Sequence, residues 1–264
     1  MVNDLGGSIG GDGSDAGPAS SVAEEIGAAG GTALADTSDV TDPLAADALV
    51  KTAVDGFGRI DILINNAGIV RWARLPEADL DSLERHLAVH LIGSFTTTRA
   101  AWRHMAEQEY GRIVNTTSSG VFGLPTNLSY AAAKGGVIGL TRSLATAGAA
   151  HGIKVNCIAP AAMTRMAGRT DDDLEGPMAP QHAAPMAAFL AHETCPVTGE
   201  IYTAGAGRFA RLFVASTEGY LHPGGAPSLE DVAASWAAIN DEAGYFVPAD
   251  LTAWSTRFTS HLDP

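Results

Sequence analysis

The sequence lacks most features that mark secreted, metal-binding and membrane proteins. Its only cysteines, Cys157 and Cys195, stand far apart and in no metal-ligand spacing, which indicates two buried thiols in a reducing compartment. No apolar run reaches the ~18 residues that a membrane-spanning helix requires. The first residues, "MVNDLGGSIGG", have neither the basic nor the apolar region of a signal peptide. We therefore expect a cytoplasmic protein with no metal site and no membrane partner.

Basic residues are also scarce. Lys and Arg together number 16, against 30 Asp and Glu, so the net charge is -14. Because no basic cluster is present either, nucleic acid and anionic membranes are not expected as partners. With 46% hydrophobic residues among 264 positions, the composition is that of a globular protein with one large domain or two small ones.

The most informative stretch is "SYAAAKGGVIGLTRSLA", residues 129–145. On a helix, Tyr130 and Lys134 lie on one face, one turn apart. A phenol has a reference pKa of about 10, and a nearby ammonium favours its ionised form. The pair therefore predicts a general acid/base acting on a hydroxyl or carbonyl group. From these residues alone, an ordinary surface helix is the simpler interpretation. The other motifs of the chain favour the acid/base pair instead.

Apolar segments alternate with amphipathic ones along the first 207 residues. Strands are predicted within residues 1–4, 32–40, 60–70, 111–123, 153–166 and 199–207, and helices at 21–30, 42–58, 79–108, 127–151 and 180–193. This alternation predicts a doubly wound α/β fold with a parallel sheet. The helix at 42–58 has clear ends, with Asp42 as N-cap, Pro43 in the first turn and Gly58 after the last.

The strand ends carry the polar residues of interest. Residues 60–70, "IDILINNAGIV", read as an apolar strand covered on both faces. In open α/β sheets, ligands bind beyond the carboxyl ends of the strands. Asn65, Ser118 and Pro160 all fall at such ends. We therefore expect the site there.

These motifs together resemble the short-chain dehydrogenase/reductase family over residues 1 to 207. "NNAG" at 65–68, serines after the next strand, "YAAAK" at 130–134 and "VNCIAP" at 155–160 stand in the family's order and spacing. "VNDLGG" at 2–7, "AWRHM" at 101–105 and "YGRIV" at 110–114 resemble one branch, the (3R)-hydroxyacyl-CoA dehydrogenase units of multifunctional peroxisomal beta-oxidation enzymes and their bacterial relatives.

The resemblance implies four catalytic residues. Tyr130 would be the acid/base, and Lys134 would lower its pKa and hold the nicotinamide ribose. Counting from the strand start points to Ser118 as the catalytic serine, with Ser119 as alternative, whereas counting back from Tyr130 gives Thr117. His90 stands where the family usually has an asparagine, as in the peroxisomal branch. The other nearby histidines, His86, His104 and His151, are expected to face solvent.

The resemblance also implies a cofactor site for NAD. Asp4, at the end of a strand, would accept hydrogen bonds from the adenosine ribose and repel the extra phosphate of NADP. The residues implied in cofactor binding are Asp4, Asp39, Asn65, Ala67, Gly68, Tyr130, Lys134, Pro160 and Thr164.

The largest departure from the family lies at the start of the chain. The family begins with a strand, a glycine-rich turn and a helix that cradle the pyrophosphate, and this unit is missing; "GGSIGG" at 6–11 reads as a loop. A start placed inside the gene and a shortened protein both explain this. We expect weak NAD binding and a first ~30 residues that are mobile or unusually paired. The strand at 1–4 should either dock on the strand at 60–70 or leave a slot there.

Residues 208–264 form a C-terminal extension beyond the dehydrogenase domain at 1–207. It contains a strand-like segment and predicted helices at 228–239 and 248–262, the first with a capping box from Ser228 and Asp231. We expect it to cover the substrate cleft or a partner subunit. The acidic run at 171–173 is interpreted as a solvated helix start, not as a metal site.

The predicted function is therefore hydride transfer between NAD and a secondary alcohol, such as a (3R)-3-hydroxyacyl-CoA. The alternatives are a dehydrogenase of steroids or other bulky alcohols, and an inactive remnant that acts only as a dimer partner. The resemblance implies a homodimer or homotetramer.

Overall fold

The computed structural model describes residues 1–168 and 176–262 of the chain. The acidic run at 171–173 lies outside the described residues. Two compact units are present, Met1–Arg211 and Leu212–Pro264, here called the N-terminal and C-terminal units. Each unit is described separately, and the N-terminal unit carries every predicted site residue.

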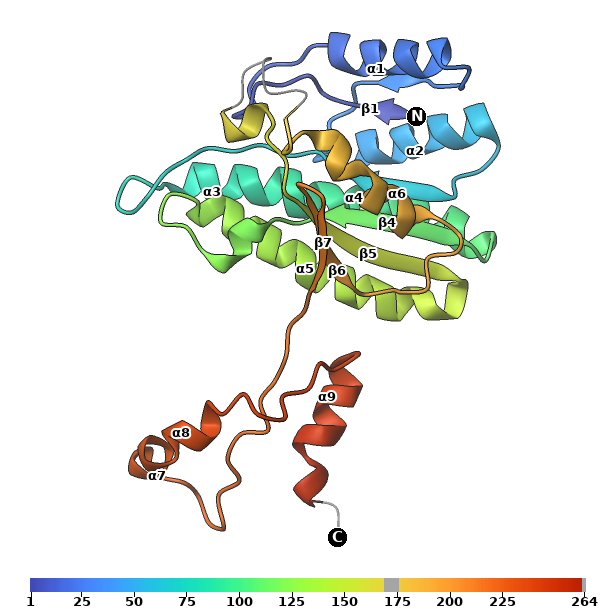
Figure 1. The fold of residues 1–264 in the computed structure, drawn as a ribbon. Coiled ribbons are helices and arrows are strands. Elements are labelled where there is room, and N and C mark those ends of the chain that lie inside the picture. The colour runs from blue at the N-terminus through green and yellow to red at the C-terminus, as the bar shows by residue number, and fades with distance from the viewer. Residues whose placement is uncertain (169–175, 263–264) are drawn as a thin grey trace. The chain divides into compact units, whose positions relative to one another are not determined.

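The N-terminal unit is built on a five-stranded sheet with the order β3-β4-β5-β6-β7. The strands are β3 (Ile62–Asn65), β4 (Gly111–Thr116), β5 (Ile153–Pro160), β6 (Ile201–Gly205) and β7 (Arg208–Leu212). β3 to β6 pair in parallel, and β7 follows β6 in a tight hairpin (Figure 1). The predicted α/β fold with a parallel sheet is confirmed.

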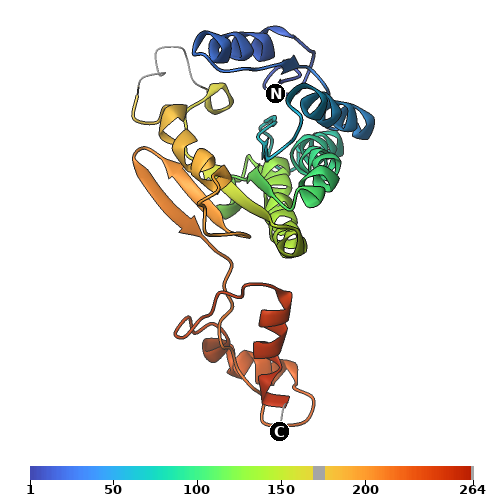
Figure 2. The same cartoon turned by 90° about the vertical axis from the view of Figure 1, so that its right-hand side faces the viewer.

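Helices cover both faces of this sheet (Figure 2). On one face lie α4 (Gly93–Glu107) and α5 (Leu128–Gly148), and α2 (Pro43–Phe57) packs on α4. On the other face lies α6 (Ala184–Ala191). Because the sheet is covered on both sides, all six residues of β4 are buried.

The local sequence signals set several helix ends. The Asp42 side chain accepts a hydrogen bond from the Leu44 amide at 2.9 Å, and Gly58 ends α2 in the left-handed region at φ 80°. The predicted helix at 79–108 is a continuous helical run in three parts, α3 (Leu80–His86), the π-helical turn η1 (Leu87–Ile92) and α4. A π-turn inside a helix often marks a functional site.

The first residues form a separate two-stranded parallel sheet, in which β1 (Val2–Asn3) pairs with β2 (Ala35–Asp36). The helix α1 (Gly17–Ala28) packs on both strands. β1 does not pair with β3, so a slot lies between the two sheets, which was the second of the two expected outcomes.

The slot changes the environment of β3. Ile62 and Ile64 are each 47% exposed, so the expectation that this strand is covered on both faces was wrong. The reason is that β3 is the edge of the five-stranded sheet and has a paired strand on one side only.

Short 3₁₀ turns complete the N-terminal unit. They are η2 (Ser119–Phe122), η3 (Ala149–His151), η4 (Arg165–Ala167) and η6 (Pro180–His182).

The C-terminal unit consists of short helices, α7 (Leu229–Ala234), α8 (Trp236–Ile239) and α9 (Leu251–Phe258), followed by η7 (Ser260–Leu262). The predicted capping box between Ser228 and Asp231 is present. The two predicted helices are shorter than expected, because the first is interrupted at Ser235 and the second begins after the N-cap Asp250. Among its described residues none is buried, so this unit has no core of its own.

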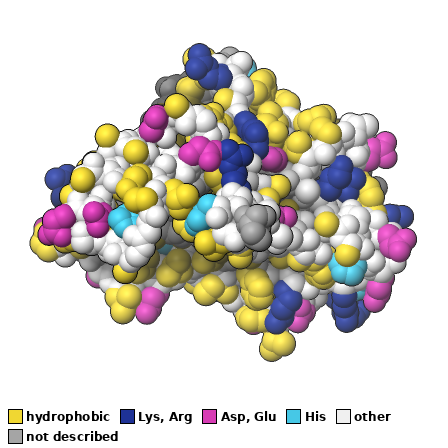
Figure 3. Space-filling model, turned by 90° about the horizontal axis from the view of Figure 1, so that it is seen from below, with side chains coloured by type: hydrophobic (Ala, Val, Ile, Leu, Met, Phe, Trp, Pro, Cys, Tyr) yellow, Lys and Arg dark blue, Asp and Glu magenta, His cyan; other side chains and the backbone are white. Residues whose placement is uncertain are grey.

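Charged side chains are dispersed on the surface. On the face shown in Figure 3, Lys and Arg side chains stand scattered among acidic and apolar ones and do not form one basic field. None of the helices in the described part of the chain is long and apolar enough to cross a membrane.

We predict that Ile113→Ala and Ile62→Ala differ strongly in their effect on stability. Ile113 is fully buried in β4, whereas Ile62, in the neighbouring strand β3, is 47% exposed toward the slot. Urea unfolding should show a loss of about 2–5 kcal/mol for Ile113→Ala and of less than about 1 kcal/mol for Ile62→Ala. Equal losses would mean that Ile62 is covered and that the slot is closed in solution.

Candidate functional site

The slot opens into a cleft of about 950 Å³. Its walls include the segments that follow the carboxyl ends of β1, β2 and β3, represented by Asp4, Asp39 and Asn65. Three strand ends that meet at one cleft form the usual ligand site of an open α/β sheet. The volume is within the range of pockets that enclose a cofactor.

Five of the nine predicted cofactor residues line this cleft: Asp4, Asp39, Asn65, Ala67 and Gly68. Tyr130, Lys134, Pro160 and Thr164 are not part of its lining, although Arg165 and Met166, directly after Thr164, are. The cleft therefore brings together the carboxylates assigned to the adenosine half of the cofactor, Asp4 and Asp39, and the residues at the end of β3 and in the loop after it.

The two carboxylates have the same local arrangement. One oxygen of Asp4 accepts the Gly6 amide at 2.7 Å, and one oxygen of Asp39 accepts the Thr41 amide at 2.8 Å. The second oxygen of each has no hydrogen-bond partner among the described residues. Carboxylates held in this way can accept hydrogen bonds from the hydroxyls of a bound sugar.

Asn65 serves the fold through its side chain. Its amide donates to the Ser94 carbonyl at 3.3 Å, to Thr98 Oγ1 at 3.1 Å and to Asn115 Oδ1 at 2.9 Å, and its oxygen accepts from Thr97 at 2.7 Å. The side chain thus fixes the end of β3 to α4 and β4. Its neighbours Ala67 and Gly68 form the wall of the cleft.

Tyr130 and Lys134 lie one turn apart on α5, as predicted. The Lys134 Nζ stands 5.6 Å from the centre of the Tyr130 ring and donates a hydrogen bond to the Thr116 carbonyl at 2.6 Å. Lys134 is only 3% exposed, and burial lowers its pKa to about 8. The ammonium is therefore fixed at the end of β4 by a backbone oxygen.

The lowering of the Tyr130 pKa by Lys134 remains a prediction, and in this structure burial is the main influence on that pKa. Burial raises the pKa of the Tyr130 phenol above its ordinary value, and the Ser118 side chain opposes that rise in its pKa. The Lys134 ammonium binds the Thr116 carbonyl, and burial determines the direction of the Tyr130 pKa. Tyr130 is consequently protonated at neutral pH and poised to donate a proton.

The three hydroxyl residues after β4 have different environments. Thr117 is 1% exposed and donates to the Lys134 carbonyl at 2.8 Å, so its hydroxyl is engaged away from the tyrosine. Ser119 is exposed. Of the three, only Ser118 influences the pKa of Tyr130, which it lowers, and its Oγ accepts the Gly120 amide at 3.0 Å. This arrangement favours Ser118 as the catalytic serine, which remains a prediction.

His90 lies beside Tyr130, with ring centres 5.1 Å apart. Its Nε2 lies 2.8 Å from the Ile69 carbonyl oxygen, and its Nδ1 is buried without a hydrogen-bond partner. Burial, reinforced by the charge of Lys134, lowers its pKa to about 3, so the ring is neutral. A Cβ atom at Gly68 would lie 2.6 Å from the His90 ring, which explains the glycine.

His86 was expected to face solvent, and this expectation was wrong. Its side chain is fully buried, with its ring stacked 6.0 Å from that of His90 and edge-on to Tyr130 at 6.2 Å. The signal was present in the sequence, because residues four apart share a helix face, and His90 was already named among the implied catalytic residues. His104 is half-buried and His151 is exposed.

Among residues 1–168 and 176–262 no three His, Cys, Asp or Glu side chains lie close enough together to hold a metal ion. Both cysteines are free and buried. Burial raises the pKa of Cys157 to about 11, so its thiol is neutral.

Comparison with known proteins identifies the family of this chain. The profile of the short chain dehydrogenase family matches residues 12–175. A putative short-chain type dehydrogenase/reductase of Mycobacterium tuberculosis is 39% identical over 251 residues, 92% of this chain and 86% of that protein. The peroxisomal multifunctional enzyme type 2 of Mus musculus is 43% identical over 80% of this chain, which spans only 29% of the mouse protein.

Solved structures give the same result. The full-length peroxisomal multifunctional enzyme type 2 of Drosophila melanogaster matches 93% of this chain and 43% of its own, with a TM-score of 0.79 and 31% identity. A short chain dehydrogenase from Mycobacterium avium matches 91% of this chain and 86% of its own, with a TM-score of 0.78 and 34% identity. Similarity over this much of the chain identifies an NAD(P)-dependent oxidoreductase. The chain belongs to the short chain dehydrogenase family.

Proposed function

We propose that this protein transfers a hydride between NAD and a secondary alcohol, most suitably a (3R)-3-hydroxyacyl-CoA. The observation that carries the proposal is the group of Ser118, Tyr130 and Lys134, in which the Ser118 side chain lowers the pKa of the phenol and the buried lysine lies 5.6 Å from the centre of the tyrosine ring. This group adjoins the cleft through His90, which contacts Gly68 and Ile69 in the cleft wall.

The residues of the cleft suit the cofactor. Asp4 and Asp39 would face the adenosine half, and the backbone of Asn65 to Gly68 the nicotinamide half. NAD, when bound, supplies the hydride acceptor. In each of the two carboxylates, one oxygen has no partner among the described residues. These two acceptors fit a sugar with two hydroxyls.

The chain's own residues would handle the proton. Ser118 holds the substrate oxygen next to Tyr130, whose phenolate accepts the alcohol proton in oxidation and whose hydroxyl returns it in reduction. Lys134, with its ammonium buried, stabilises the phenolate that oxidation requires. The neutral rings of His86 and His90 close the tyrosine from solvent on one side.

The substrate class rests on similarity. Relatives carry names such as peroxisomal hydratase-dehydrogenase-epimerase in Saccharomyces cerevisiae and 3-oxoacyl-[acyl-carrier-protein] reductase in Synechocystis. Both names belong to proteins other than this one. The second name is that of a reductase of a 3-oxoacyl group on acyl carrier protein. A steroid or other bulky alcohol as substrate, and an inactive dimer partner, remain the alternatives that turnover assays distinguish.

We also propose that the protein is a homodimer or homotetramer. The C-terminal unit has no buried residue among those described and exposes large apolar side chains, including Trp236 at 62%, Leu251 at 75% and Phe258 at 60%. Apolar surface on this scale is typical of an interface. The two buried thiols favour a reducing compartment, the cytoplasm in our proposal.

Tyr130→Phe should abolish turnover of a (3R)-3-hydroxyacyl-CoA and leave NAD binding nearly unchanged. Removing one general acid/base typically costs about 10²–10⁴ in rate, and the phenol serves the proton and not the cofactor. Turnover is measured at saturating NAD and affinity by calorimetry. Tyr110→Phe, at the opposite end of β4, is the control and should keep its activity. Comparable rates in both variants would remove Tyr130 from the mechanism.

Ser118→Ala should shift the pH dependence of alcohol oxidation to higher pH. Oxidation requires the phenolate, so its rate rises as pH approaches the Tyr130 pKa. The Ser118 side chain lowers that pKa, and its removal should raise the midpoint of kcat/KM. Ser119→Ala, the exposed neighbour, should leave the midpoint in place. A shift of equal size in both variants would contradict the assignment of Ser118.

Asp4→Ser should reduce the preference for NAD over NADP. The substitution removes a carboxylate from the cleft wall, and with it the repulsion of a second phosphate. We expect the ratio of the two dissociation constants to change by about tenfold or more, since each ~1.4 kcal/mol is a factor of ten. Asp55→Asn removes the same charge from an exposed position on α2 and serves as control. An unchanged ratio would place the ribose elsewhere.

A further inference from the structure

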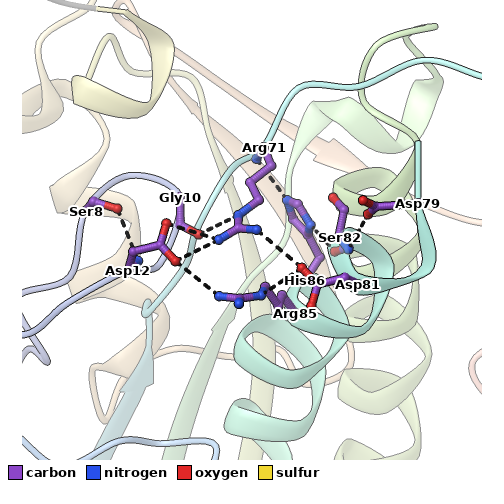
Figure 4. A network of polar contacts seen from close by, with 9 residues as sticks. All are labelled: Ser8, Gly10, Asp12, Arg71, Asp79, Asp81, Ser82, Arg85 and His86. Atoms are coloured by element: carbon purple, nitrogen blue, oxygen red, sulfur yellow. Dashed lines mark hydrogen bonds and ion pairs between the residues drawn. The ribbon is translucent and has the colours of Figure 1, made fainter. Parts of the chain in front are cut away.

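His86 uses both of its ring nitrogens. Its Nδ1 lies 2.6 Å from the Ser82 carbonyl oxygen, and its Nε2 lies 3.2 Å from the Arg71 backbone nitrogen (Figure 4). A carbonyl only accepts and an amide N–H only donates, so the proton sits on Nδ1 and Nε2 accepts. The two partners therefore fix a single neutral tautomer of the ring.

The same ring touches the candidate acid/base. It stands edge-on to Tyr130, with 88° between the ring planes, and is stacked on His90, which is itself edge-on to Tyr130. The titratable and charged groups that face His86 are Tyr130 from α5, His90 from η1 and Arg71 from the loop after β3. Burial lowers the pKa of His86, and the charge of Arg71 lowers it further. The His86 ring beside the phenol is therefore uncharged.

Arg71, whose backbone amide binds His86, reaches the glycine-rich segment with its side chain. Its Nε donates to the Gly10 carbonyl at 2.8 Å, and its guanidinium pairs with Asp12 at 2.9 Å and with Asp81 at 3.5 Å (Figure 4). Arg85 binds the same two carboxylates from α3. Gly11, inside the held segment, lines the cleft.

We propose that His86 is a positioning residue with two functions. Its ring excludes water from the Tyr130 phenol and orients it. Its Nε2 accepts the hydrogen bond of the Arg71 amide, and Arg71 in turn fixes the segment that carries Gly10 and Asp12 beside the cleft. The first function rests on the proposed role of Tyr130 as acid/base. The second depends only on the hydrogen bonds described.

Two substitutions separate the functions. His86→Phe keeps an aromatic ring against Tyr130 and leaves the Arg71 amide without an acceptor. His86→Gln keeps an acceptor for that amide and removes the ring. Ser82→Ala is the matched control, because Ser82 is a buried residue of α3 whose hydroxyl has no partner among the described residues and whose carbonyl is retained.

The readouts need no cofactor. The pKa of Tyr130 is followed by NMR of isotope-labelled Cζ, with the signal identified by Tyr130→Phe. His86→Gln should admit water and lower this pKa, with about a tenfold larger phenolate fraction at a given pH. His86→Phe should leave it in place and accelerate hydrogen exchange of the Arg71 amide by about tenfold or more. Ser82→Ala should change neither.

The proposal is overturned if both His86 variants behave like Ser82→Ala, or if they lower only the melting temperature while the Tyr130 titration and the Arg71 exchange stay unchanged. Where a variant does not fold, nitrogen NMR of the unaltered chain decides. It should show His86 as the neutral Nδ1–H tautomer at pH 7, and an Nε2–H tautomer or an imidazolium would overturn it. Turnover by Tyr130→Phe would refute the proposed function without affecting these readouts.

Discussion

The hydrogen bond from Lys134 to the Thr116 carbonyl is the interaction on which the arrangement of the site depends. It joins Thr116, the last residue of β4, to Lys134 in α5, with 2.6 Å between the carbonyl oxygen and Nζ. A buried ammonium without such a partner is costly. Thr117 returns a bond to the Lys134 carbonyl at 2.8 Å. These two contacts fix the strand end against the helix, and as a result Ser118 lies beside Tyr130.

A second constraint comes from the backbone of the loop after β3. Irregular segments that are buried must find partners for their amides and carbonyls, and two histidines supply them, His90 at Ile69 and His86 at Arg71. The π-turn Leu87–Ile92 begins directly after His86 and contains His90. The rings that hold the loop also pack against the tyrosine, so the loop's position and the environment of the phenol are set by the same side chains.

The cleft and the catalytic group place different demands on the chain. The cleft needs open strand ends and accessible carboxylates, and Asp4 and Asp39 are exposed there. The catalytic group needs low polarity, and Lys134 and His90 are almost fully buried. The similarity to short chain dehydrogenases covers both parts, from the loop before α1 to the segment after β5.

Much of the architecture was determined by local sequence. The alternation of strands and helices, the capped ends of α2 and the pairing of Tyr130 with Lys134 on one helix face follow from spacing and residue type. The exposure of β3, the burial of His86 and the raised pKa of Tyr130 did not, because each depends on a neighbour far along the chain. β1 pairs with β2 and not with β3, Arg71 donates its amide to His86, and the rings of His86 and His90 pack against Tyr130. Desolvation and partner choice are tertiary properties, which only the folded chain decided.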